Sequence, residues 1–476
     1  MKTLKVFIAF IAILTANNTH AQTVSIDKTF GENGFVKIHN VEYVPDYINH
    51  LKFDNYGNII AIGIIMNHPA VMKTNSDGIV DENFGTNGMV MLSDYTLFSL
   101  SAKIYDIKIT GENKMLIFLR CKILNQEEEK TIIIGLTENG EIDESYGDSG
   151  RVILDDIYYV GKINVENEDF MLFFDYDYDK YSLSKYNYNG EIFKNFGDKG
   201  KVYFRDDKTI RFIPYCIKIL NDGSFFLAGF DGLNDTKLAF CKINQDGAFV
   251  SDFADNGMFI MDTDSWYKKH FYQVIEKNNG ELMLIGLVLH DFFISSFNSD
   301  GTLNSSFGEN GFCFFPFEVS NIPTFLQHGE KYLIRDRIQI FCINNDGTLD
   351  KNFNNNGFLN LREFLQITLT MLLQNTDRFI VAGLDNSRFV IARMSIISDV
   401  SIEDIDKSSD FSIIFPNPVD DVLYFNAEKP YEIYDLHGKI LMKSKESKNS
   451  VNISHLTTGV YFIKFDDNKV EKFIKN

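Results

Sequence analysis

The chain has 476 residues, and 45% of them are hydrophobic, which is enough for an extensive core and for more than one domain. Its formal charge of −20 disfavours nucleic acid and anionic membrane surfaces as partners, because both would repel it. Cations and basic proteins stay open as partners.

The first residues carry a leader pattern. Lys2 and Lys5 precede an apolar run over residues 6–16. Thr19, His20 and Ala21 then form the small-residue segment in front of the expected cleavage site. This order is typical of a secretory signal peptide, residues 1–21, cleaved between Ala21 and Gln22 after export by the Sec machinery. The alternative is a membrane anchor, but a run of 11 residues is too short to cross a bilayer. No later segment is long and apolar enough to span, so we expect a soluble mature chain.

An eight-residue phrase, D-x-x-F-G-x-x-G, follows the leader and occurs seven times at intervals of 46–62 residues. We call it the repeat phrase. Its aromatic residue and its last glycine are present in every copy, as Phe30 and Gly34, Phe84 and Gly88, Tyr146 and Gly150, Phe196 and Gly200, Phe253 and Gly257, Phe307 and Gly311, and Phe353 and Gly357. We expect the aromatic residue to be a buried anchor. The constant glycine predicts a positive φ or a close backbone approach.

The other two positions of the repeat phrase vary. The leading Asp is replaced in three copies, which indicates a dispensable side-chain bond within a turn. The middle glycine becomes Ala254 in one copy and Asn354 in another. Because Asn tolerates the left-handed region and Ala does not, we expect this position to be less constrained.

Each repeat phrase lies between short strand-like segments. A D-G or N-G turn precedes most copies, an apolar run comes earlier in the unit, and a further short strand follows the phrase. Four strands in roughly fifty residues are typical of one blade of a β-propeller. The glycine within the apolar runs AIGI, LAGF, LIGL and VAGL is expected where blades converge.

The two ends of the repeat region are incomplete in complementary ways. Seven phrases bound six full units; residues 358–395 supply another unit without a closing phrase, and residues 24–34 supply a phrase with no unit before it. We therefore predict an all-β, seven-bladed propeller over 22–397, with Val24–Ile26 pairing beside Phe389–Met394 in a shared seventh blade. An open solenoid is the alternative, but it needs polar capping repeats at its ends.

The repeat phrase resembles the delta-60 repeat of secreted bacterial proteins, over residues 25–395. This resemblance implies a propeller-like β-fold. It implies no particular activity.

Residues 398–410 hold five acidic residues and four serines, which predicts an exposed linker. Residues 411–476 read as short strands separated by turns, as in a small Ig-like β-sandwich. Four ordered sub-motifs, FPNPVDDVLYF, YEIYDLHGKIL, NISHLTTGVYFIKF and KVEKFIKN, resemble the type A sorting domain of the type IX (Por) secretion system. The positions that carry the resemblance include Pro416, Asn417, Pro418, Gly438, Leu456, Gly459, Tyr461 and Lys475.

The sorting-domain resemblance implies export from a Bacteroidetes-type cell, through the periplasm and the type IX translocon. It further implies removal of the domain by a sortase, then release or attachment at the outer membrane surface. An ordinary Ig-like binding module is the alternative for residues 411–476.

No catalytic or cofactor motif is present: the sequence has no H-E-x-x-H, G-x-S-x-G, phosphate loop or C-x-x-C. We therefore expect no catalytic residues and no bound cofactor. A calcium candidate is Asp175, Asp177 and Asp179, which would share one side of a strand; a solvated hairpin tip is the alternative. The five cysteines lie in apolar runs and are expected to be buried free thiols.

Two classes of function stay open. The first is a monomeric surface or secreted protein that binds a protein or a glycan. The second is an extracellular polysaccharide hydrolase or lyase on a propeller scaffold, which requires carboxylates that converge from several blades.

Overall fold

The computed structural model describes residues 22–37, 47–65, 68–92, 102–122, 128–154, 157, 160–177, 180–204, 212–231, 237–262, 269–288, 291–315, 324–336, 338–354, 356–362, 365, 367–385, 388–398, 414–415, 419–436, 438–465 and 470–476. Every regular element within these ranges is a β-strand. The chain divides into two compact units, Met1–Asp399 and Val400–Asn476. The expected signal peptide, up to Ala21, lies outside the described residues, as does the expected linker from residue 399 onward.

The strands of the first unit form seven small antiparallel sheets among the described residues, six of four strands and one of five. The four-stranded sheets are β3 (Tyr47–Phe53), β4 (Ile59–Ile65), β5 (His68–Thr74) and β6 (Met89–Met91); β7 (Lys103–Ile109), β8 (Met115–Lys122), β9 (Glu129–Leu136) and β10 (Arg151–Leu154); β11 (Val160–Asn164), β12 (Met171–Asp177), β13 (Lys180–Tyr186) and β14 (Lys201–Tyr203); β15 (Phe212–Ile219), β16 (Phe225–Asp231), β17 (Lys237–Ile243) and β18 (Met258–Asp262); β19 (Lys269–Glu276), β20 (Leu282–Val288), β21 (Asp291–Phe297) and β22 (Phe312–Phe315); and β23 (Thr324–His328), β24 (Lys331–Arg335), β25 (Gln339–Ile343) and β26 (Phe358–Asn360).

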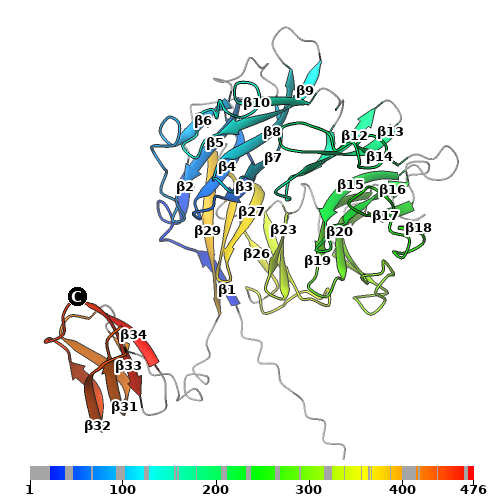
Figure 1. Ribbon diagram of the computed structural model, residues 1–476. Helices are drawn as coiled ribbons and strands as arrows, with labels where there is room; N and C mark the ends of the chain where they lie inside the picture. Colours follow the sequence, from blue (N-terminus) through cyan, green and yellow to red (C-terminus); the bar gives the residue numbers. More distant parts are fainter. Residues whose placement is uncertain are drawn as a thin grey trace, which may run out of the picture. The chain divides into compact units, whose positions relative to one another are not determined.

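The five-stranded sheet is built from both ends of the unit, and we call it the shared sheet. It contains β27 (Ile367–Asn375), β28 (Arg378–Asp385), β29 (Arg388–Ser398), β1 (Gln22–Ile26) and β2 (Phe35–Lys37). β1 pairs with the end of β29, with Val24 opposite Ile396 and Ile26 opposite Met394. β2 pairs with the earlier part of β29. The predicted pairing of the N-terminal strand into this sheet is confirmed, and Figure 1 shows blue β1 beside orange β29.

The middle strands of each sheet are buried on both faces, which explains their unbroken apolar sequences. All seven residues of β4 are buried, for example. Among the described side chains, seven hydrophobic clusters hold the unit together, and each one combines side chains from two successive sheets. One of these clusters joins the shared sheet to β3–β6, through Phe30, Ile380 and Ile48 among others. A single small sheet is only marginally stable in water, so each sheet depends for its stability on packing against both of its neighbours.

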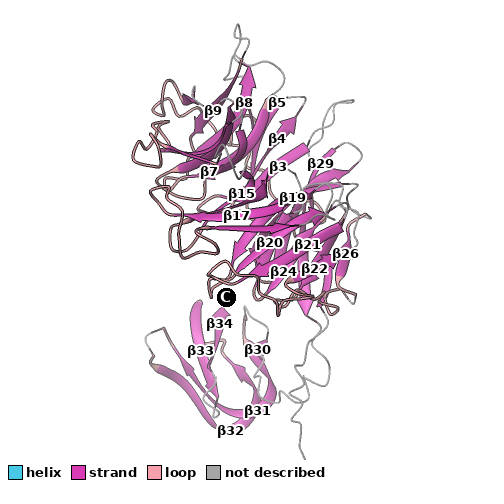
Figure 2. Cartoon of the chain, turned by 90° about the vertical axis from the view of Figure 1, so that its right-hand side faces the viewer, coloured by secondary structure: helices cyan, strands magenta, loops and turns pink. Residues whose placement is uncertain are grey.

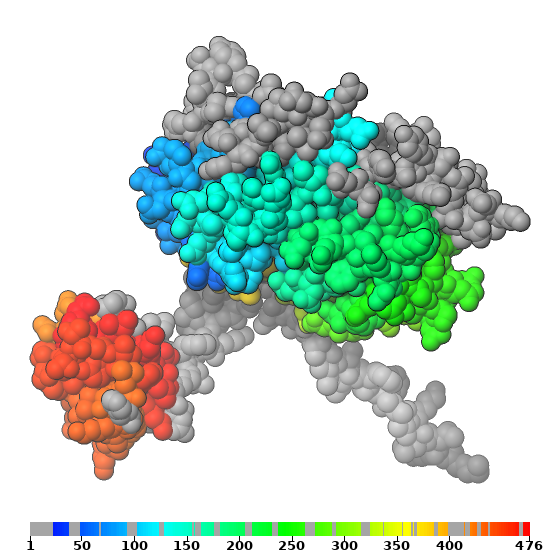
Figure 3. All heavy atoms as spheres, turned by 45° about the horizontal axis from the view of Figure 1, so that its top comes forward, coloured from blue at the N-terminus to red at the C-terminus, as the bar shows by residue number. Residues whose placement is uncertain are grey.

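Successive sheets meet through their first strands. β3 contacts β7, β7 contacts β11, β11 contacts β15, and β15 contacts β19. The side chain of Gln273 on β19 donates to the carbonyl of Phe325 on β23 at 3.2 Å. β23 in turn contacts β27, and β27 contacts β3. The arrangement is propeller-like: Figure 1 shows the small sheets fanned around a common centre, Figure 2 shows the same strands from the side, and Figure 3 shows the blue, cyan and green parts of the chain next to one another in sequence order.

Within its described residues, the second unit contains five strands, β30 (Ile414–Phe415), β31 (Val422–Tyr434), β32 (Ile440–Asn452), β33 (Gly459–Phe465) and β34 (Val470–Lys475). Hydrogen bonds connect them into one sheet in which β31 pairs with β30, β32 and β33, and β33 pairs with β34. Its own core includes Leu423, Ile433, Ile463 and Phe473, all fully or almost fully buried.

Candidate functional site

The repeat phrase forms a compact turn with a buried ring. Phe30, Phe84 and Phe353 are completely buried, and Phe196, Phe253 and Phe307 nearly so. The last glycine has a positive φ in all seven copies, between 84° and 98°, as predicted. A Cβ on Gly150 would lie 2.2 Å from Cγ2 of Ile142. Both a left-handed backbone and a lack of space therefore exclude other residues here.

The leading residue of the phrase caps the turn, also as predicted. The carboxylates of Asp27, Asp81, Asp143 and Asp350 each accept a hydrogen bond from the backbone N–H two residues later, and the side chain of Asn304 does the same. The prediction for the middle position was wrong. That residue has a φ between 47° and 57° in every copy, and Ala254 at 48° adopts it despite its Cβ. The position is therefore conformationally constrained.

The repeat phrase also binds the next sheet. In four copies the N–H of its middle residue donates to a carbonyl in the D-G or N-G turn of the following sheet, as Gly31 does to Asp77 at 2.7 Å and Gly197 to Asp246 at 2.8 Å. The turn glycine lies against the phrase's ring, since a Cβ on Gly78 would be 2.8 Å from the ring of Phe30. We call this contact between phrase and following turn the junction. It explains why the phrase and the turn recur together.

A polar side chain reinforces most junctions. It reaches the carbonyl of the second turn residue in the next sheet: Arg393 reaches Ser76 at 2.9 Å, and Lys73 reaches Glu138 at 3.2 Å. Gly135 occupies the corresponding strand position of β9, and there the phrase's own aromatic residue is Tyr146. The Tyr146 hydroxyl donates to the carbonyl of Tyr188, the second turn residue of the next sheet. The tyrosine thus supplies the donor that the strand lacks.

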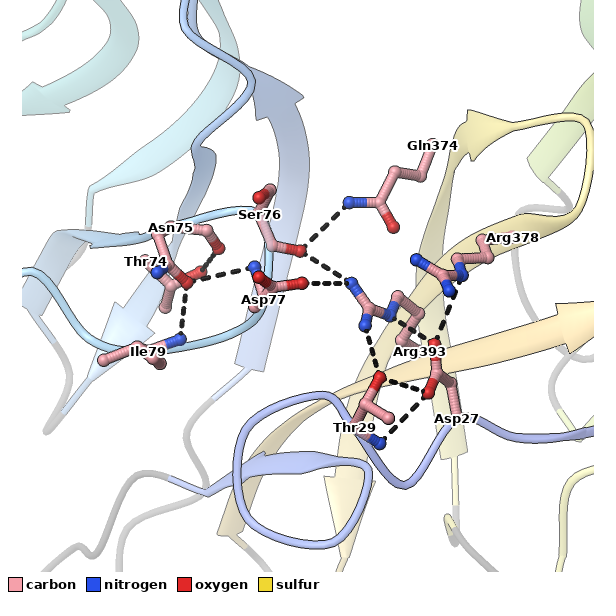
Figure 4. Close-up of polar contacts among 10 residues, drawn as sticks. All are labelled: Asp27, Thr29, Thr74, Asn75, Ser76, Asp77, Ile79, Gln374, Arg378 and Arg393. Atoms are coloured by element: carbon pink, nitrogen blue, oxygen red, sulfur yellow. Dashed lines mark hydrogen bonds and ion pairs between the residues drawn. The ribbon is translucent and has the colours of Figure 1, made fainter. Parts of the chain in front are cut away.

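The junction at the shared sheet is the most highly charged. Arg393 is 1% exposed, and its guanidinium binds Asp27 at 2.9 Å, Asp77 at 3.0 Å and the hydroxyl of Thr29 at 3.0 Å (Figure 4). Burial alone would raise the pKa of Asp27, but hydrogen bonds from Thr29 and the charge of Arg393 outweigh it and lower that pKa. We call these four residues the latch. It fixes the N-terminal phrase to the C-terminal strand β29 and to the turn of residues 75–78, which follows β5.

The apolar-run glycines lie where the first strand of a sheet is irregular. β15 has a β-bulge after Pro214, which is paired with Gly229. A Cβ on Gly229 would be 1.9 Å from the carbonyl oxygen of Ile213. Bulges at the corresponding place in β3, β19 and β27 face Gly63, Gly286 and Gly383. At Gly229 the bulged backbone of the first strand passes directly over the glycine, whereas the same bulge in β7 faces Leu119, so the bulge alone does not require glycine.

The first strands also bring a small charged group together. Asp106 on β7 lies 3.8 Å from the side chains of both His50 and Lys52 on β3. These side chains are between 21% and 39% exposed, so they are open to solvent. Asp106 therefore has one lysine and one histidine as its partners here.

The calcium candidate does not assemble within the described residues. The side chain of Asp175 is 1% exposed and lies 3.8 Å from the ammonium of Lys201. Asp177 ends β12, but its side chain and all of Asp179 lie outside what is described. No group of three metal-ligating residues occurs in the described part of the chain. The hairpin of β12 and β13 agrees with the alternative expectation, and calcium stays an untested prediction.

The five cysteines are free, as expected, and Cys121, Cys216, Cys241 and Cys342 are buried. Burial raises the pKa of the Cys121 and Cys342 thiols to about 12, so neither forms a thiolate near neutral pH. Among the described residues, no helix is long and apolar enough to cross a membrane.

In the second unit, several residues that carry the sorting-domain resemblance have structural roles. Tyr461 is 7% exposed, and its hydroxyl donates to the carbonyl of Thr457 at 2.7 Å. Gly438 has a φ of 77° in the turn before β32, and Gly459 pairs with Lys475 at the end of β34. Leu456 packs against the core. Pro416, Asn417 and Pro418 lie outside the described residues.

A groove of about 380 Å³ lies on the second unit where β31, β32 and β33 meet. Its floor includes the buried rings of Tyr431 and Phe465, and three lysines and Glu432 stand at its sides. The groove was not foreseen from the sequence, because it forms where Pro430 interrupts the pairing between β31 and β32.

Residues 413–476 match the family model of the secretion system C-terminal sorting domain. This unit is a sorting domain. The match indicates secretion by the type IX secretion system to the cell surface or the extracellular space. No curated protein sequence matches the chain.

Solved structures give weaker likenesses. An inactive virginiamycin B lyase from Staphylococcus aureus, with quinupristin, has a TM-score of 0.44 and 10% identity, covering 76% of this chain and 99% of the lyase. PorZ, a surface component of the type IX secretion system of Porphyromonas gingivalis, has a TM-score of 0.37 and 11% identity, covering 92% of this chain and 61% of PorZ. Prolyl oligopeptidase B from Galerina marginata has a TM-score of 0.44 and 11% identity, covering 89% of this chain and 56% of the peptidase. At TM-scores below 0.5, these likenesses carry no argument about the activity of this chain.

Proposed function

We propose that the chain is a secreted binding protein: a seven-bladed propeller of delta-60-type repeats, delivered by its sorting domain to a protein or glycan ligand outside the cell. The observation that carries the export step is the family match of residues 413–476, which form a compact unit of their own. The seven sheets, the seven clusters between successive sheets and the sheet shared by both ends support the propeller. On this proposal, the leader 1–21 is removed and the sorting domain is a small Ig-like sandwich.

The ionisation of the described carboxylates favours binding over polysaccharide cleavage. Those with a clear pKa shift all have a lowered pKa, as at Asp143, Asp300 and Asp346, where hydroxyl donors from Ser145, Thr302 and Thr348 stabilise the anion. A glycosidase needs a carboxylic acid with a raised pKa to protonate the leaving oxygen. These carboxylates serve turns instead. The hydrolase or lyase stays the second candidate because a propeller scaffold can carry such chemistry.

Export is tested by deleting residues 413–476 in the cell that makes the protein. The shortened protein is expected to fold and to accumulate in the periplasm, because the address is lost while the propeller is intact. The matched experiment attaches residues 400–476 to an exported reporter, which should then reach the surface or the medium. Release of the shortened protein at the wild-type level would contradict the sorting role.

Binding is tested with the full chain from Gln22 on protein and glycan arrays, with residues 400–476 alone as the control. A saturable ligand that the sorting domain does not retain supports the proposal. Each retained polysaccharide is then incubated with the chain and assayed for new chain ends. New ends would favour the enzyme. The absence of any retained ligand would contradict the binding role.

A further inference from the structure

The groove of the second unit carries more positive than negative charge. Among the described residues that line it are three lysines, Lys443, Lys445 and Lys464, and one carboxylate, Glu432. Residues 411–476 as a whole contain nine acidic residues and nine lysines, so the unit is formally neutral and the positive excess is local to the groove. The formal charge of −20 therefore belongs to the rest of the chain.

The strand register places these charges on one face of the sheet. Glu432 on β31 pairs with Lys443 on β32 and with Lys464 on β33, so the three residues form a row across three strands. Because successive side chains alternate between the two faces of a strand, Pro430 shares the face of Glu432, and Lys445 shares that of Lys443. All five residues line the groove.

The hollow comes from an interruption of the sheet. The pairing of β31 with β32 shifts its register between Tyr431 and Lys429, so that residues 445–447 of β32 lie opposite Pro430 alone. Proline has no backbone N–H to pair with, and its side chain is short, so a space stays open between the lysines. Its volume of about 380 Å³ is in the range of ligand pockets and is large enough for a short extended peptide.

The carboxylate of Glu432 already has partners within the groove. It accepts hydrogen bonds from the ammonium of Lys443 and from the hydroxyl of Tyr434, and these lower the pKa of Glu432. Lys464 acts on the same carboxylate through its charge but forms no ion pair with it. Among the described residues, no carboxylate lies within 4.0 Å of the ammonium of Lys445 or Lys464. Two positive charges at the groove are therefore available to a ligand.

An acidic peptide fits this site better than a membrane surface does. An anionic bilayer attracts a broad basic surface, whereas here two lysines stand beside a narrow hollow over a proline. A single exposed ion pair contributes little, so a ligand must engage both lysines and the apolar surface of Pro430 together. Alternate residues of an extended peptide point to the same side, so two acidic residues separated by one other residue can do this.

We propose that this groove binds an acidic peptide segment of the export machinery. The second unit is a sorting domain, so the partner that reads it is met during export. Two carboxylates of the segment pair with Lys445 and Lys464, and its apolar carbons lie over Pro430. This inference deepens the sorting role of the unit and rests on it.

The test in the cell that makes the protein is a charge reversal in the full chain, Lys445→Glu with Lys464→Glu. Like charges then face the acidic segment, so the exported fraction is expected to fall about tenfold or more, with the protein retained in the periplasm. Lys445→Arg with Lys464→Arg keeps both charges and should be exported normally. Normal export of the charge-reversed chain would overturn the groove as the recognition site, while loss of export on deletion of residues 413–476 would still support the sorting role.

The matched control is Lys439→Glu with Lys448→Glu. It makes the same change in net charge at two exposed lysines of β32 and the turn before it, neither of which lines the groove. This chain should reach the surface or the medium at the unchanged level, and an equal loss of export would show that net charge alone decides. Thermal unfolding of the purified chains checks that they fold. If the charge-reversed chain does not, Lys445→Gln with Lys464→Gln replaces it and should show the same loss of export.

Binding is measured directly with the full chain from Gln22 and the acetylated peptide Glu-Phe-Glu-Phe-Glu amide as the probe. One-to-one binding is expected, weakened by added salt and reduced about tenfold or more by Lys445→Glu with Lys464→Glu. The peptide Lys-Phe-Lys-Phe-Lys is the control and should not compete. Binding that the groove substitutions leave unchanged would contradict the proposal. Retention of the chain on vesicles of anionic lipid, lost in the same variant, with no affinity for the peptide, would assign the groove to a membrane surface instead.

Discussion

The carboxylate of Asp27 and the guanidinium of Arg393 lie 2.9 Å apart, although 366 residues separate them in the sequence. Both side chains are buried, with exposed fractions of 7% and 2%. The pair joins the first repeat phrase to the strand that completes the last repeat (Figure 4). The two ends of the unit are therefore held together by charge as well as by the pairing of β1 with β29.

Asp27→Ala is expected to lower the free energy of unfolding by about 3 kcal/mol. The substitution leaves the buried Arg393 charge with the exposed Asp77 as its carboxylate partner in the latch, and removing the buried partner of such a pair is costly. Asp77→Ala is the matched control, because that carboxylate binds the same guanidinium but is 61% exposed, and it should cost less than about 1 kcal/mol. Urea unfolding measures both. Equal effects would show that burial of Asp27 adds nothing.

The free energy of unfolding should fall as the solution is made acidic. Lowered pKa values at Asp27 and Asp54, whose ordinary value is 3.8, mean that the unfolded chain takes up protons at higher pH than the folded chain. The stabilisation is fully present above that value and is lost as the pH falls through the lower folded-state pKa values. Unfolding free energies between pH 6 and pH 2 test this. Asp27→Asn should flatten the acid limb, and an unchanged slope would contradict the assignment.

Gly150→Val should destabilise by at least about 1–3 kcal/mol, because a side chain meets both a left-handed backbone and the Ile142 methyl at 2.2 Å. Gly57→Val separates the two causes. Gly57 has a φ of 81°, but nothing lies within 4 Å of its Cβ position, so that variant reports backbone strain alone. Thermal unfolding of the two variants gives the difference. A larger loss at Gly57 would rule out crowding as a cause.

Ala254→Gly should stabilise the protein by about 0.5–1 kcal/mol. Ala254 has a φ of 48° where most copies have glycine, and a left-handed alanine costs about 1–2 kcal/mol, part of which glycine loses to chain entropy. Urea unfolding gives the change. Destabilisation would mean that contacts of the alanine methyl outweigh the strain.

The repeated units, the positive φ of the last glycine and the pairing of residues 22–26 with 394–398 could be predicted because each depends on local turn chemistry or on counting repeats. The middle position was misjudged because tolerance was inferred from two substitutions. One of these, Ala254, keeps the left-handed φ, and its N–H bonds to the carbonyl of Asp300. Ala254 therefore adopts a strained backbone conformation, which this hydrogen bond across the junction stabilises. The sequence pattern gives no sign of that hydrogen bond.

The latch escaped prediction for a related reason. In the sequence, Arg393 is a single cation within an apolar run. Its structural role depends on its hydrogen bond to the Ser76 carbonyl, which belongs to a turn of another sheet. Contacts across junctions require the register of two neighbouring sheets, which hydrophobic periodicity does not provide.

The most direct test of the account removes the N-terminal strand and supplies it again as a peptide. A chain that starts at residue 47 should be less stable than the chain from Gln22, because β29 loses both β1 and β2. A synthetic peptide of residues 22–37 should bind it with one-to-one stoichiometry and raise its unfolding midpoint, and the same peptide with Asp27→Ala should bind more weakly. A shortened chain as stable as the full one, with no affinity for the peptide, would contradict closure of the propeller by its own two ends.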